Sequence, residues 1–240
     1  MEMPTVEAAL VTGGTGALGR AVVSRFLADG MAVAVTYFSE KEWRDLAAAE
    51  ADASRSGKLQ GFRADLTDEA AARGAVEAAV NSLGGLRVLA HLAGGYAGGV
   101  DLEQVDVKTV RQMIDTNLLT AMLAAKHVIP HAKRSGAGRL LFISSRGAIE
   151  CYPGSGPYAA AKAGLLALAV TLSKELKESG VTANAVLPSV IDTAANRASM
   201  PKADHSTWVK PSEIAGLLSY LASRGAQSVS GALIPIYGRA

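Results

Sequence analysis

Short runs of β-branched and leucine residues alternate with long alanine-rich stretches along the whole chain. Strands and helices that alternate in this way are typical of βαβ units, which build a parallel sheet with helices on both faces. We expect strands at residues 8–12, 31–37, 59–64, 87–92, 140–144, 182–187 and 232–236. The pattern therefore predicts an α/β fold, a doubly wound parallel sheet of about seven strands, in a single domain over residues 1–240.

Helices are expected between these strands. Ser39 and Glu42 have the spacing of a capping box and open a helix that runs to about residue 56, and Thr67 caps the next one. A long helical run from about residue 108 to 133 contains Pro130, which should end or kink it. Further helices are expected at 20–28, 158–178 and 213–222. In such a sheet a ligand binds outside the carboxyl ends of the strands, where the strand order reverses.

Composition excludes several classes of protein. The 240 residues carry 24 Lys and Arg against 22 Asp and Glu, a net charge of +2, and 49% are hydrophobic. This balance is typical of neither a disordered chain nor a nucleic-acid-binding protein. The single cysteine forms no internal disulfide, and the four histidines show no metal-ligand spacing, so we expect no metal site.

We also expect no membrane segment. Charges or glycines interrupt every apolar stretch before the roughly 18 residues that a membrane span needs. The first residues lack the basic and apolar regions of a signal peptide, so the expected location is the cytoplasm.

A glycine-rich loop follows the first predicted strand and opens the first helix. Glycines at 13, 16 and 19 allow a tight turn, close approach of the backbone and close helix packing, while the helix N-terminus offers N–H donors to a pyrophosphate. A tight turn without a ligand is the alternative, but the place of the loop in the first βαβ unit favours a dinucleotide site. The expected contacts are Gly13, Thr15, Gly16, Ala17, Leu18 and Gly19.

The second predicted strand ends without an acidic residue. NAD-specific proteins usually have one there for the ribose hydroxyls, whereas this chain has Thr36-Tyr37-Phe38-Ser39. This favours NADP over NAD, with Ser39, Lys41 and Arg20 as candidates for the 2′-phosphate. After the third and fourth strands, the residues expected to meet the adenine, ribose and nicotinamide are Asp65, Leu66, Ala93, Gly94 and Gly95.

Ser145, Tyr158 and Lys162 form the most informative group. Tyr158 and Lys162 are four residues apart, which places phenol and ammonium on one helix face. A neighbouring cation favours phenolate and lowers the pKa of the tyrosine toward the working range. Ser145 ends a predicted strand and is expected to orient a substrate oxygen for proton transfer.

With these motifs, the sequence resembles the classical short-chain dehydrogenase/reductase family over essentially its whole length. The resemblance implies a Rossmann-like fold, a dimer or tetramer, and hydride transfer between NAD(P) and a small carbonyl or alcohol substrate. It implies that Tyr158 is the acid–base group and that Lys162 holds the nicotinamide ribose, while Asn117 holds a water of the proton relay. The matching residues are those from Thr12 to Gly19, with Asp65, Ala93, Gly94, Asn117, Ser144, Ser145, Tyr158, Lys162, Pro188 and Thr193.

The chain departs from the family pattern at three places. Ala17 replaces the middle glycine of the loop, His91 and Leu92 stand where an asparagine pair is usual, and Ser189 replaces the glycine after Pro188. None of these changes removes a proposed catalytic group. On its predicted core strand, His91 is expected to be a hydrogen-bonded structural residue rather than a base.

A long segment at about residues 189–211 is expected to form a lid over the substrate. Two segments, 93–99 and 192–208, look like those of quinonoid dihydropteridine reductase and imply a pocket for a flat heterocycle, with Tyr96, Tyr152 and Trp208 as its walls. That enzyme resembles NADH users and lacks a serine at the position of Ser145. Reduction of a ketone or 3-oxoacyl substrate is therefore the main hypothesis, and pteridine reduction is an alternative.

One alternative comes from outside enzymes: an NAD(P)-binding sensor or scaffold that kept the fold without turnover. The presence of all four proposed catalytic residues argues against it. The helices around Asn117 and Tyr158 have apolar residues on more than one side, which favours burial against a second copy in a homodimer or homotetramer.

Overall fold

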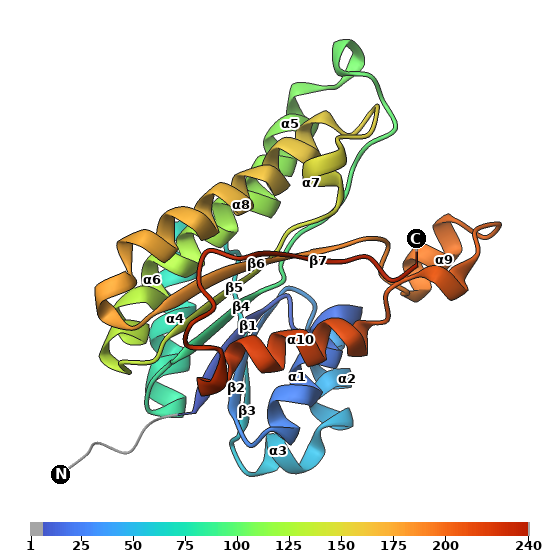
Figure 1. Ribbon diagram of the computed structural model, residues 1–240. Coiled ribbons are helices and arrows are strands. Elements are labelled where there is room, and N and C mark those ends of the chain that lie inside the picture. The colour runs from blue at the N-terminus through green and yellow to red at the C-terminus, as the bar shows by residue number, and fades with distance from the viewer. Residues whose placement is uncertain (1–6, 240) are drawn as a thin grey trace.

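Seven parallel strands form one sheet in the computed structural model, which describes residues 7–239 (Figure 1). They are β1 (Ala8–Thr12), β2 (Ala32–Tyr37), β3 (Leu59–Arg63), β4 (Val88–His91), β5 (Arg139–Ile143), β6 (Thr182–Pro188) and β7 (Leu233–Ile236). Their order is β3-β2-β1-β4-β5-β6-β7, so the direction of winding reverses between β1 and β4. The predicted doubly wound sheet is confirmed, and each strand begins and ends within one residue of its predicted bounds.

Helices cover both faces of the sheet (Figure 1). One face carries α1 (Ala17–Ala28), α2 (Glu40–Ala49) and α10 (Pro211–Ala222), and the other carries α4 (Glu69–Leu83), α6 (Thr120–Arg134) and α8 (Gly156–Glu175). The remaining helices are α3 (Ala51–Arg55), α5 (Val107–Ile114), α7 (Gly147–Glu150) and α9 (Ala194–Ser199). Short 3-10 turns are η1 (Leu102–Gln104), η3 (Lys177–Ser179), η4 (His205–Thr207) and η5 (Arg224–Ala226), and η2 (Asp115–Leu119) is a π-helical turn.

The core lies in two layers, one on each face of the sheet. Side chains alternate along β1, so Ala9 and Val11 pack with α1 and α10 while Ala8 and Leu10 pack with α4, α6 and α8. All five residues of β1 are buried. Burial on both faces explains why this strand reads as a continuous apolar run rather than an alternating one.

The long helix predicted over about residues 108–133 is interrupted, but not at Pro130. The π-helical turn η2 separates α5 from α6, while Pro130 lies inside α6, which continues to Arg134. Residues of α6 on both sides of the proline, such as Val128 and Ala132, are buried against the sheet. We infer that this packing offsets the one backbone hydrogen bond that proline removes.

The two predicted helix caps have different outcomes. Ser39 caps α2 by accepting a hydrogen bond from the amide of Glu42, as expected, but the other half of the predicted capping box is not formed, because the Glu42 carboxylate accepts from the Thr15 hydroxyl. Thr67 does not cap α4, because Asp68 accepts from the Ala71 amide instead. Both residues have oxygen side chains suited to a cap, so sequence alone does not separate neighbouring candidates.

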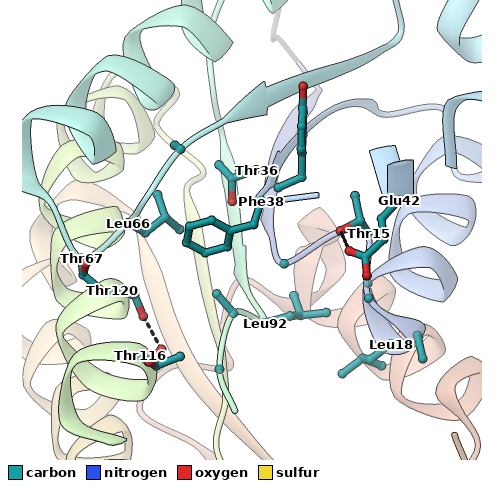
Figure 2. A pocket seen from close by; sticks show the side chains of 18 of the residues that line it. Thr15, Leu18, Thr36, Phe38, Glu42, Leu66, Thr67, Leu92, Thr116 and Thr120 are labelled. Atoms are coloured by element: carbon teal, nitrogen blue, oxygen red, sulfur yellow. Dashed lines mark hydrogen bonds between the residues drawn. The ribbon is translucent and has the colours of Figure 1, made fainter. Parts of the chain in front are cut away.

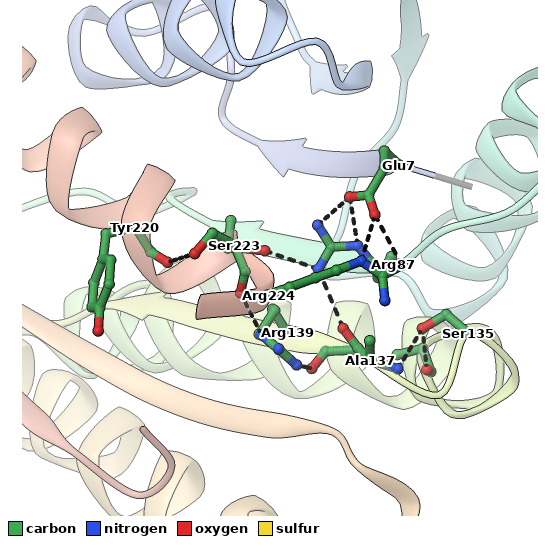
Figure 3. A network of polar contacts seen from close by, with 11 residues as sticks. Glu7, Arg87, Ser135, Ala137, Arg139, Tyr220, Ser223 and Arg224 are labelled. Carbon is green, nitrogen blue, oxygen red and sulfur yellow. Dashed lines mark hydrogen bonds and ion pairs between the residues drawn. The ribbon is translucent and has the colours of Figure 1, made fainter. Parts of the chain in front are cut away.

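A cluster of arginines fixes the amino-terminal edge of the sheet (Figure 3). The buried Arg87 pairs with Glu7 and donates to the Ala222 carbonyl, at 2.8 Å, at the end of α10. Arg139 donates to the Ser223 carbonyl at 3.1 Å. These bonds satisfy carbonyls at the C-terminus of a helix, where cations are favourable. These bonds attach α10 to the amino-terminal edge of the sheet, whereas the glycine loop lies at the carboxyl edge.

Within residues 7–239, no helix has the length and apolarity needed to cross a membrane. The same residues contain no group of three or more His, Cys, Asp or Glu side chains placed to hold a metal ion.

Candidate active site

The glycine loop brings bare backbone to the carboxyl end of β1. Gly13 has a φ of +64°, and a Cβ atom there would lie 3.0 Å from the amide nitrogen of Ala93. A Cβ on Gly19 would lie 2.2 Å from the carbonyl oxygen of Gly13. The N-cap of α1 is Gly16, which has no side chain to accept the first N–H groups of the helix. The loop therefore leaves these donors available to an anionic ligand.

We predict that Gly19→Ala abolishes this site. The added methyl group collides with loop backbone, so the loop must move away from the start of α1. Affinity for NADPH should fall by about 100-fold or more, measured by nicotinamide fluorescence, since loop strain of this kind costs several kcal/mol. Gly74→Ala is the control, because a Cβ there meets nothing within 4 Å. Unchanged cofactor affinity in Gly19→Ala would contradict the assignment of the loop.

A cavity of about 480 Å³ runs from this loop across the carboxyl ends of β1, β2 and β4 (Figure 2). Ten of the residues predicted to bind the cofactor line it: Gly13, Thr15, Gly16, Ala17, Leu18, Gly19, Leu66, Ala93, Gly94 and Thr193. This volume is in the range of small-molecule and cofactor sites. The structure thus gathers residues from separate segments of the chain at the point where the strand order reverses.

Other predicted cofactor residues do not line this cavity. Ser39 is used as the cap of α2, and the Asp65 carboxylate accepts from the amide and hydroxyl of Thr67. Gly95 is bonded to the side chain of Asn117, and Pro188 is the last residue of β6. The structure therefore gives Ser39 and Asp65 local partners at the ends of their strands.

An acidic side chain that the sequence did not single out for binding lines the cavity. Glu42 accepts a hydrogen bond of 3.1 Å from the Thr15 hydroxyl (Figure 2). Arg20 lies beside it and donates to the carbonyls of Thr15 and Glu42. Lys41 instead pairs with Asp45 and is highly exposed. Among the three residues considered for the 2′-phosphate, Arg20 is the one held next to the cavity wall.

Ser145, Tyr158 and Lys162 meet at the end of β5. Lys162 is buried and donates from Nζ to the Ile143 carbonyl at 2.9 Å, while the Ser144 hydroxyl donates to the Lys162 carbonyl at 2.7 Å. These two bonds align the end of the strand with α8. Tyr158 lies one turn before Lys162, whose Nζ is 5.9 Å from the centre of its ring. The Ser145 side chain is hydrogen-bonded to Tyr158 and accepts from the Gly147 amide at 3.1 Å.

The protonation states differ from the expectation for Tyr158. Burial raises the pKa of Tyr158 above its ordinary value, and only the hydrogen bond with Ser145 acts in the opposite direction. Burial also lowers the pKa of Lys162 to about 8. The predicted lowering of the Tyr158 pKa by Lys162 is not found, because the Lys162 ammonium points to the Ile143 carbonyl. Tyr158 therefore holds its proton at neutral pH.

Asn117 lies in the π-helical turn η2 and is fully buried. Its amide group donates to the carbonyls of Gly95 and Met113, both at 3.0 Å, and its Oδ1 accepts from the Gly95 amide at 3.1 Å. Both amide hydrogens are thus used by backbone carbonyls. The side chain holds the segment after β4 in place, and the water expected at Asn117 stays a prediction. Such π-helical turns are frequent at functional sites.

The three predicted substrate residues lie in different surroundings. The ring of Tyr96 meets that of Tyr158 edge-on, with centroids 5.0 Å apart and planes at 81°. Tyr152 is half exposed, near Gly147 and Ser145. Trp208 is only 7% exposed and packs against His205, with centroids 4.4 Å apart, so it presents little surface to a substrate.

The segment expected to form a lid has its own short structure. It contains α9 and η4, and its two ends are joined by a parallel bridge between Ile191 and Val209. The chain end crosses it, since the Arg239 amide donates to the Thr207 carbonyl at 3.0 Å. Thr193 both caps α9 and lines the cavity. This places the segment next to the predicted cofactor site.

Several residues that line the cavity are not predicted from the sequence. The sequence predicts Glu42 only as part of a helix cap, and Thr116 and Thr120 only as part of a helix. The spacing of Ser39 and Glu42 is the signal that points to this place, because the Ser39 cap brings the first turn of α2 to the end of β2. Thr116 and Thr120 had no signal of their own in one sequence.

Comparison with known proteins gives a consistent result. Residues 7–204 match the family model described as short chain dehydrogenase. The chain is 33% identical over 237 residues to 3-oxoacyl-[acyl-carrier-protein] reductase MabA of Mycobacterium tuberculosis, a match that covers 95% of this chain and 90% of that protein.

Solved structures give the same picture. A blue fluorescent protein from a metagenomic library, in complex with NADPH, is 30% identical with a TM-score of 0.86, and the match covers 97% of this chain and 96% of that one. A single-residue variant of actinorhodin polyketide ketoreductase, with NADPH, is 25% identical with a TM-score of 0.89, and the match covers 99% and 98%. The similarity to dihydropteridine reductase stays a prediction from the two segments.

Proposed function

Since this chain belongs to the short-chain dehydrogenase/reductase family of NAD(P)-dependent oxidoreductases, we propose that it transfers a hydride between the nicotinamide and a small ketone or 3-oxoacyl substrate, or the corresponding alcohol. The observation that carries this proposal is the convergence of Ser145, Tyr158 and Lys162 beside a glycine-lined cavity. The cavity fits a dinucleotide, because its floor is backbone that a single Cβ would obstruct.

Each side chain has a defined task in reduction. A bound nicotinamide would supply the hydride that adds to the carbonyl carbon. Tyr158 donates its hydroxyl proton to the carbonyl oxygen as that oxygen gains charge, and Ser145 holds the oxygen by a hydrogen bond. The raised pKa of Tyr158 keeps this proton available at neutral pH. Lys162 fixes the end of β5, next to Ser145, through its bond to the Ile143 carbonyl.

The proposed cofactor is NADP rather than NAD. The end of β2 has no acidic residue at positions 36–38, and Arg20 is held close to the cavity wall. The MabA and NADPH-bound relatives belong to the same family. Glu42 opposes this preference, since its carboxylate lies in the cavity near Thr15 and would repel a 2′-phosphate.

We predict that Glu42→Gln strengthens NADPH binding about fivefold and leaves NADH binding unchanged. The substitution removes the repulsion between the Glu42 carboxylate and the 2′-phosphate, and for two charges about 4 Å apart in water this repulsion is roughly 1 kcal/mol. The dissociation constants of both cofactors should be measured at low ionic strength, where screening is least. Glu77→Gln, on the exposed side of α4, is the matched control. An equal gain for NADH and NADPH would show that Glu42 does not face the 2′ position.

The proposed substrate is apolar next to its carbonyl group. Beyond Tyr158, the loop that contains Gly99 meets the loop that contains Gly154. A hydrogen bond of 2.9 Å from the Gly99 amide to the Gly154 carbonyl joins them. Exposed apolar side chains on and beside these loops are Tyr96, Val100, Leu102, Val107, Ile149 and Tyr152. A group of exposed apolar residues beside a catalytic side chain supports a ketone or acyl chain with an apolar substituent.

The test is turnover of a substrate panel. Ketones, 3-oxoacyl thioesters, quinones and quinonoid dihydropterin are each added to enzyme with NADPH, and oxidation of the nicotinamide is followed by absorbance. We expect turnover of a ketone or 3-oxoacyl thioester. Turnover of the dihydropterin alone would favour the pteridine alternative, and cofactor binding without turnover of any member would favour the sensor alternative.

Two further proposals come from the sequence. We propose a cytoplasmic protein that forms a homodimer or homotetramer. Exposed apolar residues such as Met122 on α6 support association between copies. Sedimentation of the purified protein tests the oligomeric state.

A further inference from the structure

A histidine is buried between the glycine loop and the helix that carries Asn117. His91 is the last residue of β4 and is fully buried. It lies opposite Thr12 of β1 in the sheet register. Its Nδ1 is 2.9 Å from the Thr12 hydroxyl, and its Nε2 is 3.3 Å from the Thr120 hydroxyl at the start of α6. The ring therefore connects two strands and one helix at the carboxyl edge of the sheet.

The hydrogen bonds around the ring fix which nitrogen carries the proton. The Thr12 oxygen already accepts from the amides of Leu92 and Ala93, at 3.1 and 3.2 Å. A hydroxyl has two acceptor sites and one donor, so Thr12 donates its proton to Nδ1 of His91. This arrangement favours an Nδ1 that carries no hydrogen and a neutral ring with its proton on Nε2.

The other side of the ring has a consistent arrangement. The Thr120 hydroxyl donates to the Thr116 carbonyl at 2.8 Å, so its oxygen is free to accept from Nε2 of His91. The chain of bonds runs in one direction, from Thr12 through His91 and Thr120 to the backbone of the π-helical turn.

The electrostatics of the site agree with a neutral ring. Burial, with a further effect of the Lys162 charge, lowers the pKa of His91 to about 3, against a smaller opposing effect of the Ala93 backbone. A second cation beside the buried Lys162 would be unfavourable.

This chain of bonds ends at groups that line the cofactor cavity. Thr12 holds the amide of Ala93, directly beside Gly13. Thr116 and Thr120, on the far side, flank Asn117, whose amide group clamps Gly95. Space here is tight, because a Cβ on Gly94 would lie 2.7 Å from Oδ1 of Asn117. A small displacement of either wall therefore moves the segment from Ala93 to Gly95.

We propose that His91 is a positioning residue, which as the neutral Nε2–H tautomer joins Thr12 to Thr120 and so sets the distance between the Ala93–Gly95 segment and the helix of Asn117. This inference rests on the proposed function, since it assigns that segment to the nicotinamide half of the cofactor. His91 touches neither cofactor nor substrate and acts through these neighbours.

The first experiment reads the tautomer directly in the wild-type protein. Histidine side chains labelled with a nitrogen isotope are observed by NMR, and His91 is assigned among the four histidines by the signal lost in His91→Asn. We expect the pattern of a proton on Nε2 alone, unchanged between about pH 6 and 8, a range that spans the ordinary histidine pKa. A proton on Nδ1, or titration with an ordinary pKa, would overturn the proposal.

The second experiment measures cofactor affinity in variants that keep one end of the bridge. Asparagine at position 91 reaches the place of Nδ1, glutamine reaches that of Nε2, and phenylalanine removes both. We expect NADPH to bind about tenfold more weakly to His91→Phe, and His91→Asn and His91→Gln to lie between it and the wild type, since each of these two keeps one of the two hydrogen bonds of the bridge.

Asn184→Ala is the control for a purely structural loss. Asn184 is a buried polar residue that connects β6 to the turn before β7, through bonds of 2.8 and 3.0 Å. Its loss should lower Tm without changing cofactor affinity. If the His91 variants lower Tm but bind NADPH as the wild type does, the positioning role is wrong. If the wild type binds no nicotinamide cofactor, the proposed function fails, while the NMR result still tests the tautomer.

Discussion

Tyr158→Phe should lower kcat for carbonyl reduction by about 10³-fold while leaving NADPH affinity within about twofold of the wild type, because general acid catalysis contributes 10²- to 10⁴-fold. Phenylalanine keeps the ring that packs edge-on against Tyr96. It removes only the hydroxyl that is bonded to Ser145. Single-turnover absorbance measurements and fluorescence titrations on the same preparation separate the two effects.

Tyr220→Phe is the matched control. This tyrosine is exposed on α10, so loss of its hydroxyl should change neither turnover nor cofactor affinity. Activity retained in Tyr158→Phe would contradict the mechanism. Loss of cofactor affinity together with activity would instead assign Tyr158 a binding role.

Lys162→Met should have opposite effects on activity and stability. We expect kcat/KM for NADPH to fall by about 100-fold, because the variant removes the bond to the Ile143 carbonyl that holds the end of β5 beside Ser145 and Tyr158. The cofactor-free protein should nevertheless become more stable. A pKa of about 8 against 10.5 in the unfolded chain corresponds to a cost of roughly 3 kcal/mol for the buried ammonium.

Part of this gain is lost again, because the Ile143 carbonyl is left without its donor, at a cost of about 1 kcal/mol or more. The net gain of about 1 to 2 kcal/mol should raise Tm by about 5 °C in a domain of this size. The wild type gains stability as the pH rises from about 8 to 10.5, since over this range the unfolded lysine binds a proton that the folded lysine has released. The advantage of the variant is therefore largest below pH 8 and shrinks above it.

Thermal unfolding of both proteins across this pH range is the measurement. Lys174→Met is the control, since Lys174 is exposed on the same helix and its replacement should alter neither activity nor the pH profile of Tm. A variant that is less stable than the wild type at neutral pH would contradict a strained, buried ammonium at position 162.

The strands and the glycine loop were predictable because their signals are local. A fully buried strand such as β1 must be apolar at every position, and the turn after it needs glycine at position 13, where φ is positive. The i, i+4 spacing of Tyr158 and Lys162 follows from helix geometry alone. Their common place at the sheet edge then follows from the winding of the strands.

Details that depend on side-chain direction were not predictable. Lys162 points to the Ile143 carbonyl rather than lowering the pKa of Tyr158, because the end of β5 offers an acceptor that spacing does not reveal. Glu42 enters the cavity because α2 begins directly after β2. Trp208 folds inward onto His205, and an irregular segment gives no periodicity from which to predict that choice.

Fluorescence titration of the wild-type protein with NADPH and NADH is the decisive experiment, because every proposed residue role depends on a nicotinamide dinucleotide in the glycine-lined cavity. We expect saturable binding of both cofactors, tighter for NADPH, and loss of this binding in Gly19→Ala but not in Gly74→Ala. Absence of saturable binding of either cofactor to the folded wild type would contradict the account.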